Sequence, residues 1–564
     1  MKTVGIMISH DASVCVVEDG EIKNIMQEER CSRVKHDSYP SKAYERLFGD
    51  DVPSDELLNT DFGFAGIRYW PVNDLAQDFQ LSFEQEVYSF TNYVISKSTD
   101  IHSKRVKMED NDIEKWENKW RDTRFDDHHV FHAFCGFYNS GFKDAAVLVV
   151  DGMGNPSQKE SENHEVASIY TVEYPANIVC LSKEETPKHH AELMKARSSH
   201  TKWPMGIGMA YSSIAAYCGF GQLGSGKIMG LASYGNRIKG YYEWLRKRPY
   251  DDFCIDAFNF ERVRKFGYEI EGKRKPELQT AYGYVQDTVM GITPHHVDWL
   301  YTAQEVLFEK IINYVLDSYN EKDEFTYTGG VAHNVNLNAL MQQVFPNMKI
   351  PPYVGDEGLS LGGMYYLLQK HQVKADIPKY QADVEILPQP KFVTIAKMAE
   401  EISRGLIVAN HQMGAEIGPR ALGNRSIFYR PDMANAPKLF NIRGIKKREW
   451  WRPYGISLLQ EDANRFLTTP VPSPYMLHTS TLTEEGKKAL SGVVHVDGTV
   501  RYQTVENDWY ALMLMQLKRL TGSSAVVNTS LNSFGKPLSH TIEDTKKFAE
   551  EAKPDLTFIG DDIY

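Results

Sequence analysis

The first half of the sequence contains two copies of one strand–turn–strand pattern. The first copy reads TVGIMIS, a polar HDAS turn, VCVVE, an Asp19-Gly20 turn and EIKNIMQEE. The second begins near residue 144 with DAAVLVVDGMGN, an apolar strand that ends in Asp151 and Gly152, and continues with VASIYTVE and ANIVCLSKE. An Asp-Gly pair between β-rich segments is a strong hairpin signal. Two copies of this unit predict a duplicated pair of α/β lobes.

The chain is long enough for more than one domain, because 564 residues exceed what a single hydrophobic core usually supports. Duplicated α/β lobes of this kind build the actin-like (ASKHA) fold, which we expect over residues 1–385, with an insertion at about 236–300. Residues 372–392 contain three prolines and no periodicity, which is typical of a linker. A second, smaller α/β domain is therefore predicted over 393–564.

Charge and cysteine content restrict the class of protein. The 63 Lys and Arg against 75 Asp and Glu give a net charge of −12, which argues against a protein that coats nucleic acid. The six cysteines include no CxxC pair, which is typical of free thiols in a reducing compartment. The start MKTVGIMISHDASVC reaches His10 before a signal-peptide apolar segment could form, and no stretch approaches the ~18 apolar residues of a membrane span. We therefore expect a cytoplasmic protein with no membrane segment.

A pair of histidines gives the sharpest local signal for a metal. His128 and His132 lie four residues apart in DDHHVFHAFCGFYN and share one face of the predicted helix. Asp151 ends a buried-type strand and Asp356 lies in the loop PPYVGDEGLSLGG, so two carboxylates could converge on the pair. Two imidazoles with carboxylates suit iron, manganese or zinc. Because no HExxH glutamate is present, an interface pair is the alternative, and His129 is expected to be structural.

Two glycine-rich turns favour a nucleotide site. Lys227 in GSGKIMG could place an ammonium group beside a phosphate, although the GxxxxGK[ST] spacing of a P-loop is absent and a packing turn is the alternative. Gly329 and Gly330 lead from a predicted strand into a helix, where unpaired backbone amides at the positive end of the helix can bind an anion.

The last third of the chain contains a set of cationic and small polar residues. Guanidinium groups bind phosphate and carboxylate oxygens in forked pairs, and adenylate or phosphoryl transfer depends mainly on charge and position. Two tryptophans and a proline within IKKREWWRP suggest a shaped site, whereas a solvated basic surface is the alternative. The set is Arg420, Arg425, Lys446, Arg448, Arg452, Arg501, Asn528, Thr529 and Ser530.

Taken together, the motifs resemble those of the O-carbamoyltransferases, the group that includes the nodulation-factor, cephamycin and tobramycin carbamoyltransferases. The resemblance spans nearly the whole chain in the expected order. The motifs that carry it are HDAS, QEERCSRVKH, HHVFH, VVDGMG, GKIMGLA, GGVAHNVNLN, EIGPRALGNRS, KKREWWRP and NTSLNSFGKP.

This resemblance implies an actin-like amino-terminal domain and a YrdC-like carboxy-terminal domain. The YrdC-like part would convert carbamoyl phosphate and ATP, with Mg²⁺, into carbamoyl-adenylate and pyrophosphate. The amino-terminal part would then transfer the carbamoyl group to an acceptor hydroxyl at an iron site, whose ligands match His128, His132, Asp151 and Asp356.

The resemblance also assigns catalytic and binding roles. His10 matches the position beside the acceptor, where a neutral imidazole can take the hydroxyl proton. Lys446 and Arg452 match positions at the carbamoyl phosphate and are expected to be catalytic. The expected nucleotide and carbamoyl phosphate contacts are Lys227, Gly329, Gly330, Asn334, Arg420, Arg501, Asn528, Thr529 and Ser530.

Three features depart from the family pattern and leave the acceptor open. His333 stands where the family usually has a small or apolar residue, Lys536 replaces a common acidic residue, and 236–300 does not align with the family. Antibiotic sugars, lipo-oligosaccharides and other small hydroxyl compounds are all compatible acceptors. So is a hydroxymethylated nucleobase, even within DNA, if the insertion builds a basic groove.

Other functions are compatible with parts of this pattern. An actin-like phosphotransferase acting on a sugar or polyol would release ADP instead of AMP and pyrophosphate. A tRNA-modifying enzyme that makes threonylcarbamoyl-adenosine would need a basic surface, which the net charge of −12 disfavours. A nucleotide-gated binding protein would use the histidine pair for a structural metal. The oligomeric state is open, and a homodimer is compatible with the sequence.

Overall fold

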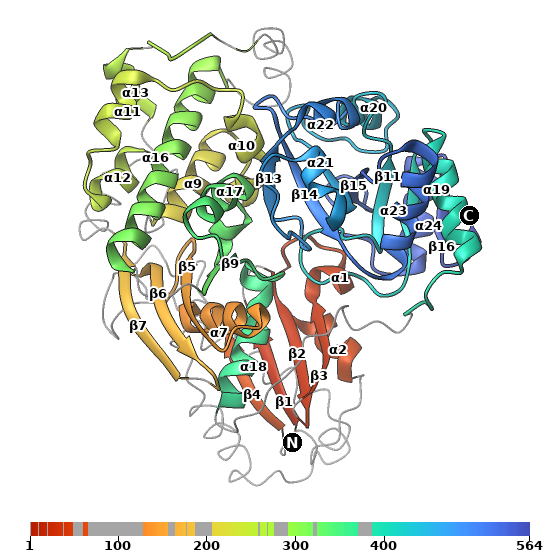
Figure 1. The fold of residues 1–564 in the computed structure, drawn as a ribbon. Helices are drawn as coiled ribbons and strands as arrows, with labels where there is room; N and C mark the ends of the chain where they lie inside the picture. The colour runs from red at the N-terminus through yellow and green to blue at the C-terminus, as the bar shows by residue number, and fades with distance from the viewer. Residues whose placement is uncertain are drawn as a thin grey trace.

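Three β-sheets organise the part of the chain that the computed structural model describes (Figure 1). Residues 2–48, 60–65, 128–155, 164–186, 206–275, 292–319, 324–369 and 386–564 are described, apart from positions 9, 10, 20, 38, 176, 258, 259, 268 and 274. The expected base His10 and most of the predicted linker therefore lie outside the described residues.

The first sheet has the strand order β3-β2-β1-β4. Strands β1 to β3 form the antiparallel meander expected from the Asp19 turn, and β4 pairs in parallel with β1. Two short helices, α1 and α2, follow β3. The bounds are β1 Lys2–Met7, β2 Ser13–Glu18, β3 Glu21–Gln27, α1 Glu28–Ser32, α2 Ser41–Phe48 and β4 Thr60–Ala65.

The second sheet repeats this arrangement in the order β7-β6-β5-β8-β9. Strands β5 to β7 again form an antiparallel meander, and β8 pairs in parallel with the first strand of that meander. The bounds are β5 Asp144–Val150, β6 Glu165–Glu173, β7 Asn177–Glu185, β8 Phe325–Thr328 and β9 Met348–Lys349. The two sheets therefore share one strand pattern.

Helices α7 (His128–Ser140) and α18 (Leu359–Gln369) lie between these two sheets (Figure 1). The close approach of α18 to its neighbours depends on glycine. A Cβ on Gly5 of β1 would meet the Ser360 carbonyl oxygen of α18 at 1.8 Å. A Cβ on Gly362 of α18 would meet the Phe131 carbonyl oxygen of α7 at 2.1 Å. This packing holds the start of α7 near the start of α18.

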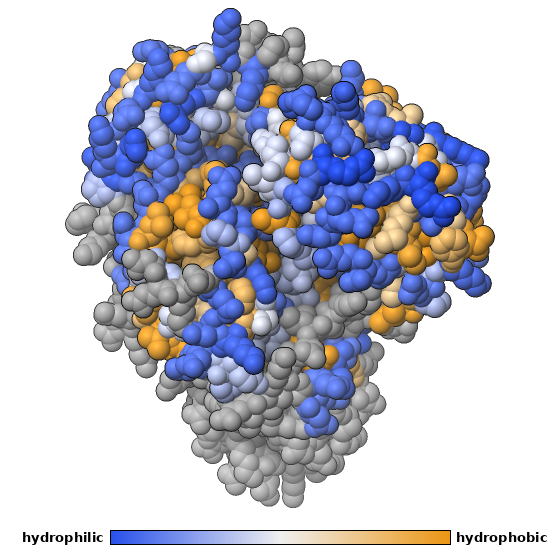
Figure 2. Space-filling view, in the orientation of Figure 1, coloured by the Kyte–Doolittle hydropathy of each residue, from blue (hydrophilic) through white to orange (hydrophobic). Residues whose placement is uncertain are grey.

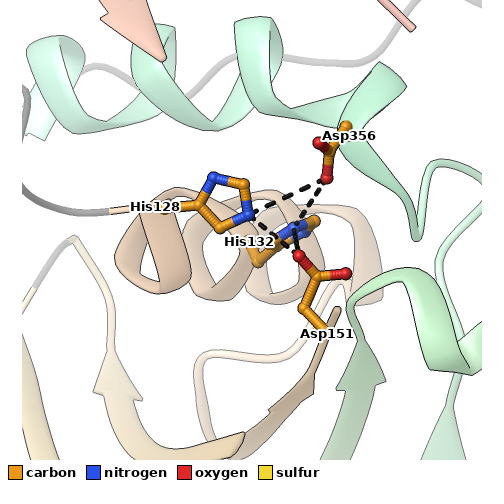
Figure 3. Close-up of side chains that lie close together, drawn as sticks. All are labelled: His128, His132, Asp151 and Asp356. Carbon is orange, nitrogen blue, oxygen red and sulfur yellow. Dashed lines mark hydrogen bonds and ion pairs between the residues drawn. The ribbon is translucent and has the colours of Figure 1, made fainter. Parts of the chain in front are cut away.

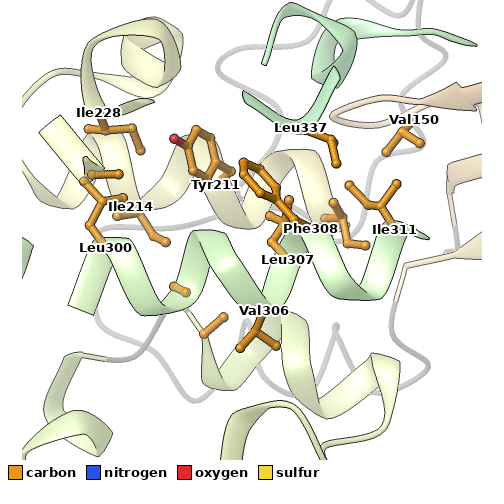
Figure 4. Packing of buried hydrophobic residues seen from close by; sticks show 14 of the residues in the cluster. Val150, Tyr211, Ile214, Ile228, Leu300, Val306, Leu307, Phe308, Ile311 and Leu337 are labelled. Atoms are coloured by element: carbon orange, nitrogen blue, oxygen red, sulfur yellow. The ribbon is translucent and has the colours of Figure 1, made fainter. Parts of the chain in front are cut away.

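A layer of helices covers the second sheet and contains most of the described part of the expected insertion. Figure 4 shows Ile228 beside Ile214 and Leu300, and Tyr211 beside Phe308 of α16, in a buried core that extends to Val150 of β5. The described residues of 236–275 are thus continuous with the main core. The helices are α9 Ile207–Tyr217, α10 Ser225–Ala232, α11 Lys239–Leu245, α12 Tyr250–Asp256, α13 Phe260–Val263, α16 Pro294–Ser318 and α17 Val335–Val344.

The third sheet has eight strands in the order β13-β14-β12-β15-β11-β10-β16-β17 and mixes parallel and antiparallel pairs. Neighbouring residues supply separate cores on its two faces: Val526 packs with one cluster and Val527 with the other. Helices α19 and α23 cover one face together. The mixed α/β architecture predicted from the sequence is confirmed.

The bounds of the elements in this carboxy-terminal part, in chain order, are α19 Phe392–Ser403, β10 Val408–His411, β11 Arg425–Tyr429, α20 Ala436–Ile442, β12 Gly455–Leu459, α21 Ala463–Phe466, β13 His478–Thr481, α22 Glu484–Ala489, β14 Thr499–Val505, α23 Asp508–Thr521, β15 Val526–Ser530, α24 Ile542–Ala552, β16 Leu556–Ile559 and β17 Asp562–Ile563. Among the described helices, none combines the length and the apolar character needed to cross a membrane.

Candidate functional site

Four side chains from three separate parts of the chain converge in a buried cluster (Figure 3). His128 and His132 lie one turn apart on α7, Asp151 directly follows β5, and Asp356 begins a 3-10 turn that leads into α18. His128 Nε2 lies 3.0 Å from Asp151 Oδ2, and His132 Nε2 lies 3.5 Å from Asp356 Oδ1. The remaining two histidine–aspartate separations are both 3.8 Å.

The geometry of this cluster fits one metal ion. All four ligand atoms lie within 4.8 Å of one another, and the side chains are buried. Atoms that each lie about 2.1 Å from one ion are about 3.0 Å apart at a right angle and about 4.2 Å apart when opposed. Two imidazole nitrogens and two carboxylate oxygens are a donor set that suits iron, manganese or zinc.

The electrostatics of the cluster also favour a cation. Burial alone would lower the pKa of His132, but the hydrogen bonds and charges of Asp151 and Asp356 outweigh it and raise the pKa to about 9. Two carboxylates in a buried site therefore attract positive charge strongly, whether as a proton or as a metal ion.

The Gly329-Gly330 turn supports this cluster. The backbone N–H of Gly330 donates to Asp151 Oδ1 at 2.9 Å, and Gly329 has φ +94, where a Cβ would meet the Val150 carbonyl oxygen at 2.3 Å. Asn334 caps α17, with its Oδ1 accepting from Leu337 N. The sequence predicts that the Gly330 N–H contacts a nucleotide, but in the structure it donates to the Asp151 carboxylate of the cluster.

Buried Lys446 and four partly buried arginines form a second charged region. Burial, followed by the charges of Arg420, Arg448 and Arg452, lowers the pKa of Arg501 well below its usual range. Burial, with Arg448 and Arg452, likewise lowers the pKa of Lys446. The structure thus brings Arg420, Lys446, Arg452 and Arg501 near one another, with Arg448 among them. Like charges held this close in a buried region favour an anionic ligand.

Lys446 and Lys227 have protein partners within this region. Lys446 Nζ donates to the Ser530 carbonyl oxygen at 2.5 Å and to Asn532 Oδ1 at 2.8 Å. Lys227 Nζ lies 3.0 Å from Glu449 Oε1, and Glu449 also pairs with Arg452 at 3.2 Å. Lys227 therefore joins α10 to the segment that carries the cations.

Other expected residues hold the polypeptide around the cations. The Asn528 amide donates to the Ala421 carbonyl oxygen at 3.1 Å and to Ser457 Oγ at 3.0 Å, which fixes the loop after Arg420. Arg425 is buried and donates to the Gln412 carbonyl oxygen at 2.5 Å. Thr529 is buried in β15.

The two charged regions meet at His333 and Glu357. Burial and the charge of Arg420 lower the pKa of His333 to about 3, while Asp151 of the cluster acts in the opposite direction. Glu357 follows Asp356, and burial raises the pKa of its carboxyl to about 8. The charge of Glu357 in turn acts on Arg420. Neighbouring charged groups therefore connect the histidine–aspartate cluster with the cations.

Sequence reasoning missed the docking role of the QEERCSRVKH segment. Arg30 donates to the Gly418 carbonyl oxygen at 2.6 Å, and Arg33 donates to the Leu538 carbonyl oxygen at 2.7 Å. Lys35 lies close enough to Arg452 for the two charges to interact. In the sequence, only the high density of charged residues in this segment could have indicated this role. Its contacts place α1 against loops of the carboxy-terminal part (Figure 1).

Comparisons with known proteins define the class. The family model described as "Carbamoyltransferase N-terminus" matches residues 72–364, and the one described as "Carbamoyltransferase C-terminus" matches 399–564. The chain belongs to the carbamoyltransferase family. The resemblance to O-carbamoyltransferases found in the sequence is thereby confirmed.

Curated relatives agree with this assignment. Nodulation protein NolNO of Sinorhizobium fredii is 25% identical over 574 residues, which cover 95% of this chain and 76% of the relative. The 3'-hydroxymethylcephem-O-carbamoyltransferase of Amycolatopsis lactamdurans is 28% identical over 275 residues, 46% of this chain and 52% of that protein. Among solved structures, component A of the (R)-2-hydroxyglutaryl-CoA dehydratase of Acidaminococcus fermentans has a TM-score of 0.33 and 11% identity over 66% of this chain and 100% of its own, a likeness too low to carry an argument.

Proposed function

We propose that this member of the carbamoyltransferase family is an ATP-dependent O-carbamoyltransferase. Its carboxy-terminal part would make carbamoyl-adenylate from carbamoyl phosphate and ATP, with release of pyrophosphate. Its amino-terminal part would transfer the carbamoyl group to an acceptor hydroxyl. The observation that carries this proposal is the adjacency of the partly buried cations to the histidine–carboxylate cluster, through Arg420, His333 and Glu357.

The two charged regions suit the two steps. Carbamate is a poor electrophile, and a mixed anhydride with AMP has a leaving group whose negative charge Arg420, Arg452 and Arg501 can neutralise. Because such an anhydride hydrolyses readily, transfer between neighbouring buried sites protects it from water. His128, His132, Asp151 and Asp356 would hold Fe²⁺, or alternatively Mn²⁺ or Zn²⁺, and a bound ion supplies Lewis-acid chemistry. Mg²⁺ is expected with ATP.

The repeated strand pattern supports the finer architecture. We infer that the two amino-terminal sheets are the halves of a duplicated actin-like body, because both place a parallel strand beside the first strand of a meander. We assign the mixed eight-stranded sheet to a YrdC-like domain. All six cysteines are unpaired, which supports a cytoplasmic location.

The acceptor is proposed from chemistry. A small hydroxyl compound agrees with a buried transfer site, and the name of the cephem relative supports a hydroxymethyl group as one acceptor class. A hydroxymethylated nucleobase, free or within DNA, belongs to the same chemical class.

The test supplies ATP, carbamoyl phosphate, Mg²⁺ and Fe²⁺ with a panel of hydroxylated compounds. We expect AMP and pyrophosphate together with a product heavier by one carbamoyl group. Lys446→Met should suppress AMP formation, whereas Asp356→Asn should suppress transfer and leave AMP formation intact. Arg443→Met, at an ion pair with Asp555, is the matched control. Release of ADP without AMP would contradict the proposal and favour a phosphotransferase.

A further inference from the structure

His333 is a further polar group between the two charged regions, and the steps proposed above assign it no role. It ends the turn Gly330–His333, whose first N–H holds Asp151. Its Nε2 lies 3.7 Å from Glu357 Oε1, and a Cβ on Gly355 would meet the same Nε2 at 3.0 Å. The Nε2 side of the ring therefore faces the loop that carries Asp356.

The other ring nitrogen is unused. His333 Nδ1 is buried and has no hydrogen-bond partner among the described residues. A buried polar atom without a partner costs free energy unless a bound molecule or water supplies one. The cluster ligands His132 and Asp356 have side chains that are 0% and 3% exposed, whereas the His333 side chain is 30% exposed. His333 therefore stands at the border between the cluster and solvent.

The charge state of the ring restricts what Nδ1 can bind. Burial and Arg420 keep the imidazole neutral at physiological pH, since they lower its pKa to about 3. A neutral ring has one N–H, which either ring nitrogen can carry. An alcohol hydroxyl can both donate and accept, so it pairs with Nδ1 in either tautomer. A phosphate dianion has no donor to offer.

We propose that His333 Nδ1 forms a hydrogen bond with the acceptor's hydroxyl and orients the hydroxyl oxygen toward the carbamoyl group. The ligand class is an alcohol carried by a small molecule or by a hydroxymethyl substituent. This inference rests on the proposed function and adds one residue that contacts the acceptor. The carbamoyl amino group is the competing donor, and the experiment separates the two.

Glycerol serves as the probe, in competition with water for the activated carbamoyl group. The enzyme receives ATP, carbamoyl phosphate, Mg²⁺, Fe²⁺ and glycerol, and the ratio of carbamoylated glycerol to hydrolysed carbamoyl group is measured with total AMP. His333→Leu removes the hydrogen-bonding nitrogen, whereas His333→Asn keeps an amide that can donate or accept near the Nδ1 position. His295→Leu, near the start of α16, is the matched control.

We expect His333→Leu to lower the ratio about fivefold, the effect of one neutral hydrogen bond, with AMP formation unchanged. His333→Asn should restore most of the ratio, and His295→Leu should leave it unchanged. An unchanged ratio in His333→Leu overturns the inference, because loss of a contact to the carbamoyl group affects water and glycerol alike. AMP without any carbamoylated glycerol in the unmodified enzyme also overturns it. Absence of AMP in every variant instead overturns the proposed function.

Discussion

Replacing Arg420 by methionine should make the protein more stable when no anion is bound. Burial, with the charge of Arg452, lowers the pKa of Arg420 to about 10, and its Nε has no hydrogen-bond partner among the described residues. A guanidinium pKa is ordinarily above about 12, so this lowering corresponds to about 3 kcal/mol of unfavourable free energy in the folded protein. Methionine keeps most of the aliphatic stem and removes the charge. We therefore expect the free energy of unfolding to rise by about 1–3 kcal/mol.

The same substitution should abolish most of the stabilisation by an anion. Pyrophosphate at a hundred times its Kd stabilises a folded protein by about 2.7 kcal/mol. Loss of one charged hydrogen-bond donor costs about 1.5–3 kcal/mol of binding, so little of that gain should remain. The penalty of a cation with a lowered pKa is complete below that pKa, and it is lost gradually as pH rises from about 10 toward the ordinary guanidinium pKa. The difference between variant and unmodified protein should therefore be constant over the neutral range.

Urea unfolding with and without pyrophosphate is the assay, because guanidinium chloride would screen the charges. Arg443→Met is the control, since Arg443 forms a two-pronged ion pair with Asp555 at 2.9 Å and 2.9 Å. This partly exposed pair should contribute less than about 1 kcal/mol, and its loss should lower stability and leave the pyrophosphate effect unchanged. The reasoning is refuted if Arg420→Met is less stable than the unmodified protein in anion-free buffer, or gains as much from pyrophosphate.

Three further perturbations test other parts of the structure. Burial raises the pKa of the Glu28 carboxyl to about 7, although backbone hydrogen bonds act to lower it. The free energy of unfolding should therefore fall as pH rises from about 4.5 to about 7. Urea titrations at several pH values should show that Glu28→Gln removes this dependence on pH. Asp151→Asn keeps an acceptor for Gly330 but removes one carboxylate, so calorimetric titration with Mn²⁺ should show at least tenfold weaker binding, with an unchanged Kd contradicting the metal site. A double-mutant cycle of Lys227→Met and Glu449→Gln should give a coupling energy of about 0.5–1 kcal/mol, and zero coupling would show that the 3.0 Å pair does not hold α10 to the cation segment.

Much of the local structure follows from short-range pattern. Alternating and apolar segments around Asp19 predict the first meander, and the apolar segment that ends at Asp151 predicts β5. His128 and His132 share a face because an α-helix repeats every 3.6 residues. These features depend on neighbours within about one element, so the sequence carries them directly.

Which residues converge was decided by the tertiary structure. Asp356 reaches the histidines because α18 packs against α7 and β1, a contact that no spacing in the sequence encodes. Arg420 and Arg425 belong to one motif, yet Arg420 faces other cations while Arg425 donates to backbone carbonyl oxygens. The amino-acid sequence determined the elements and the chemical groups available on each, through backbone periodicity and side-chain type. Burial, partners and pKa values were decided only when sheets and helices from distant parts of the chain packed together, because electrostatic and desolvation energies depend on separations in space.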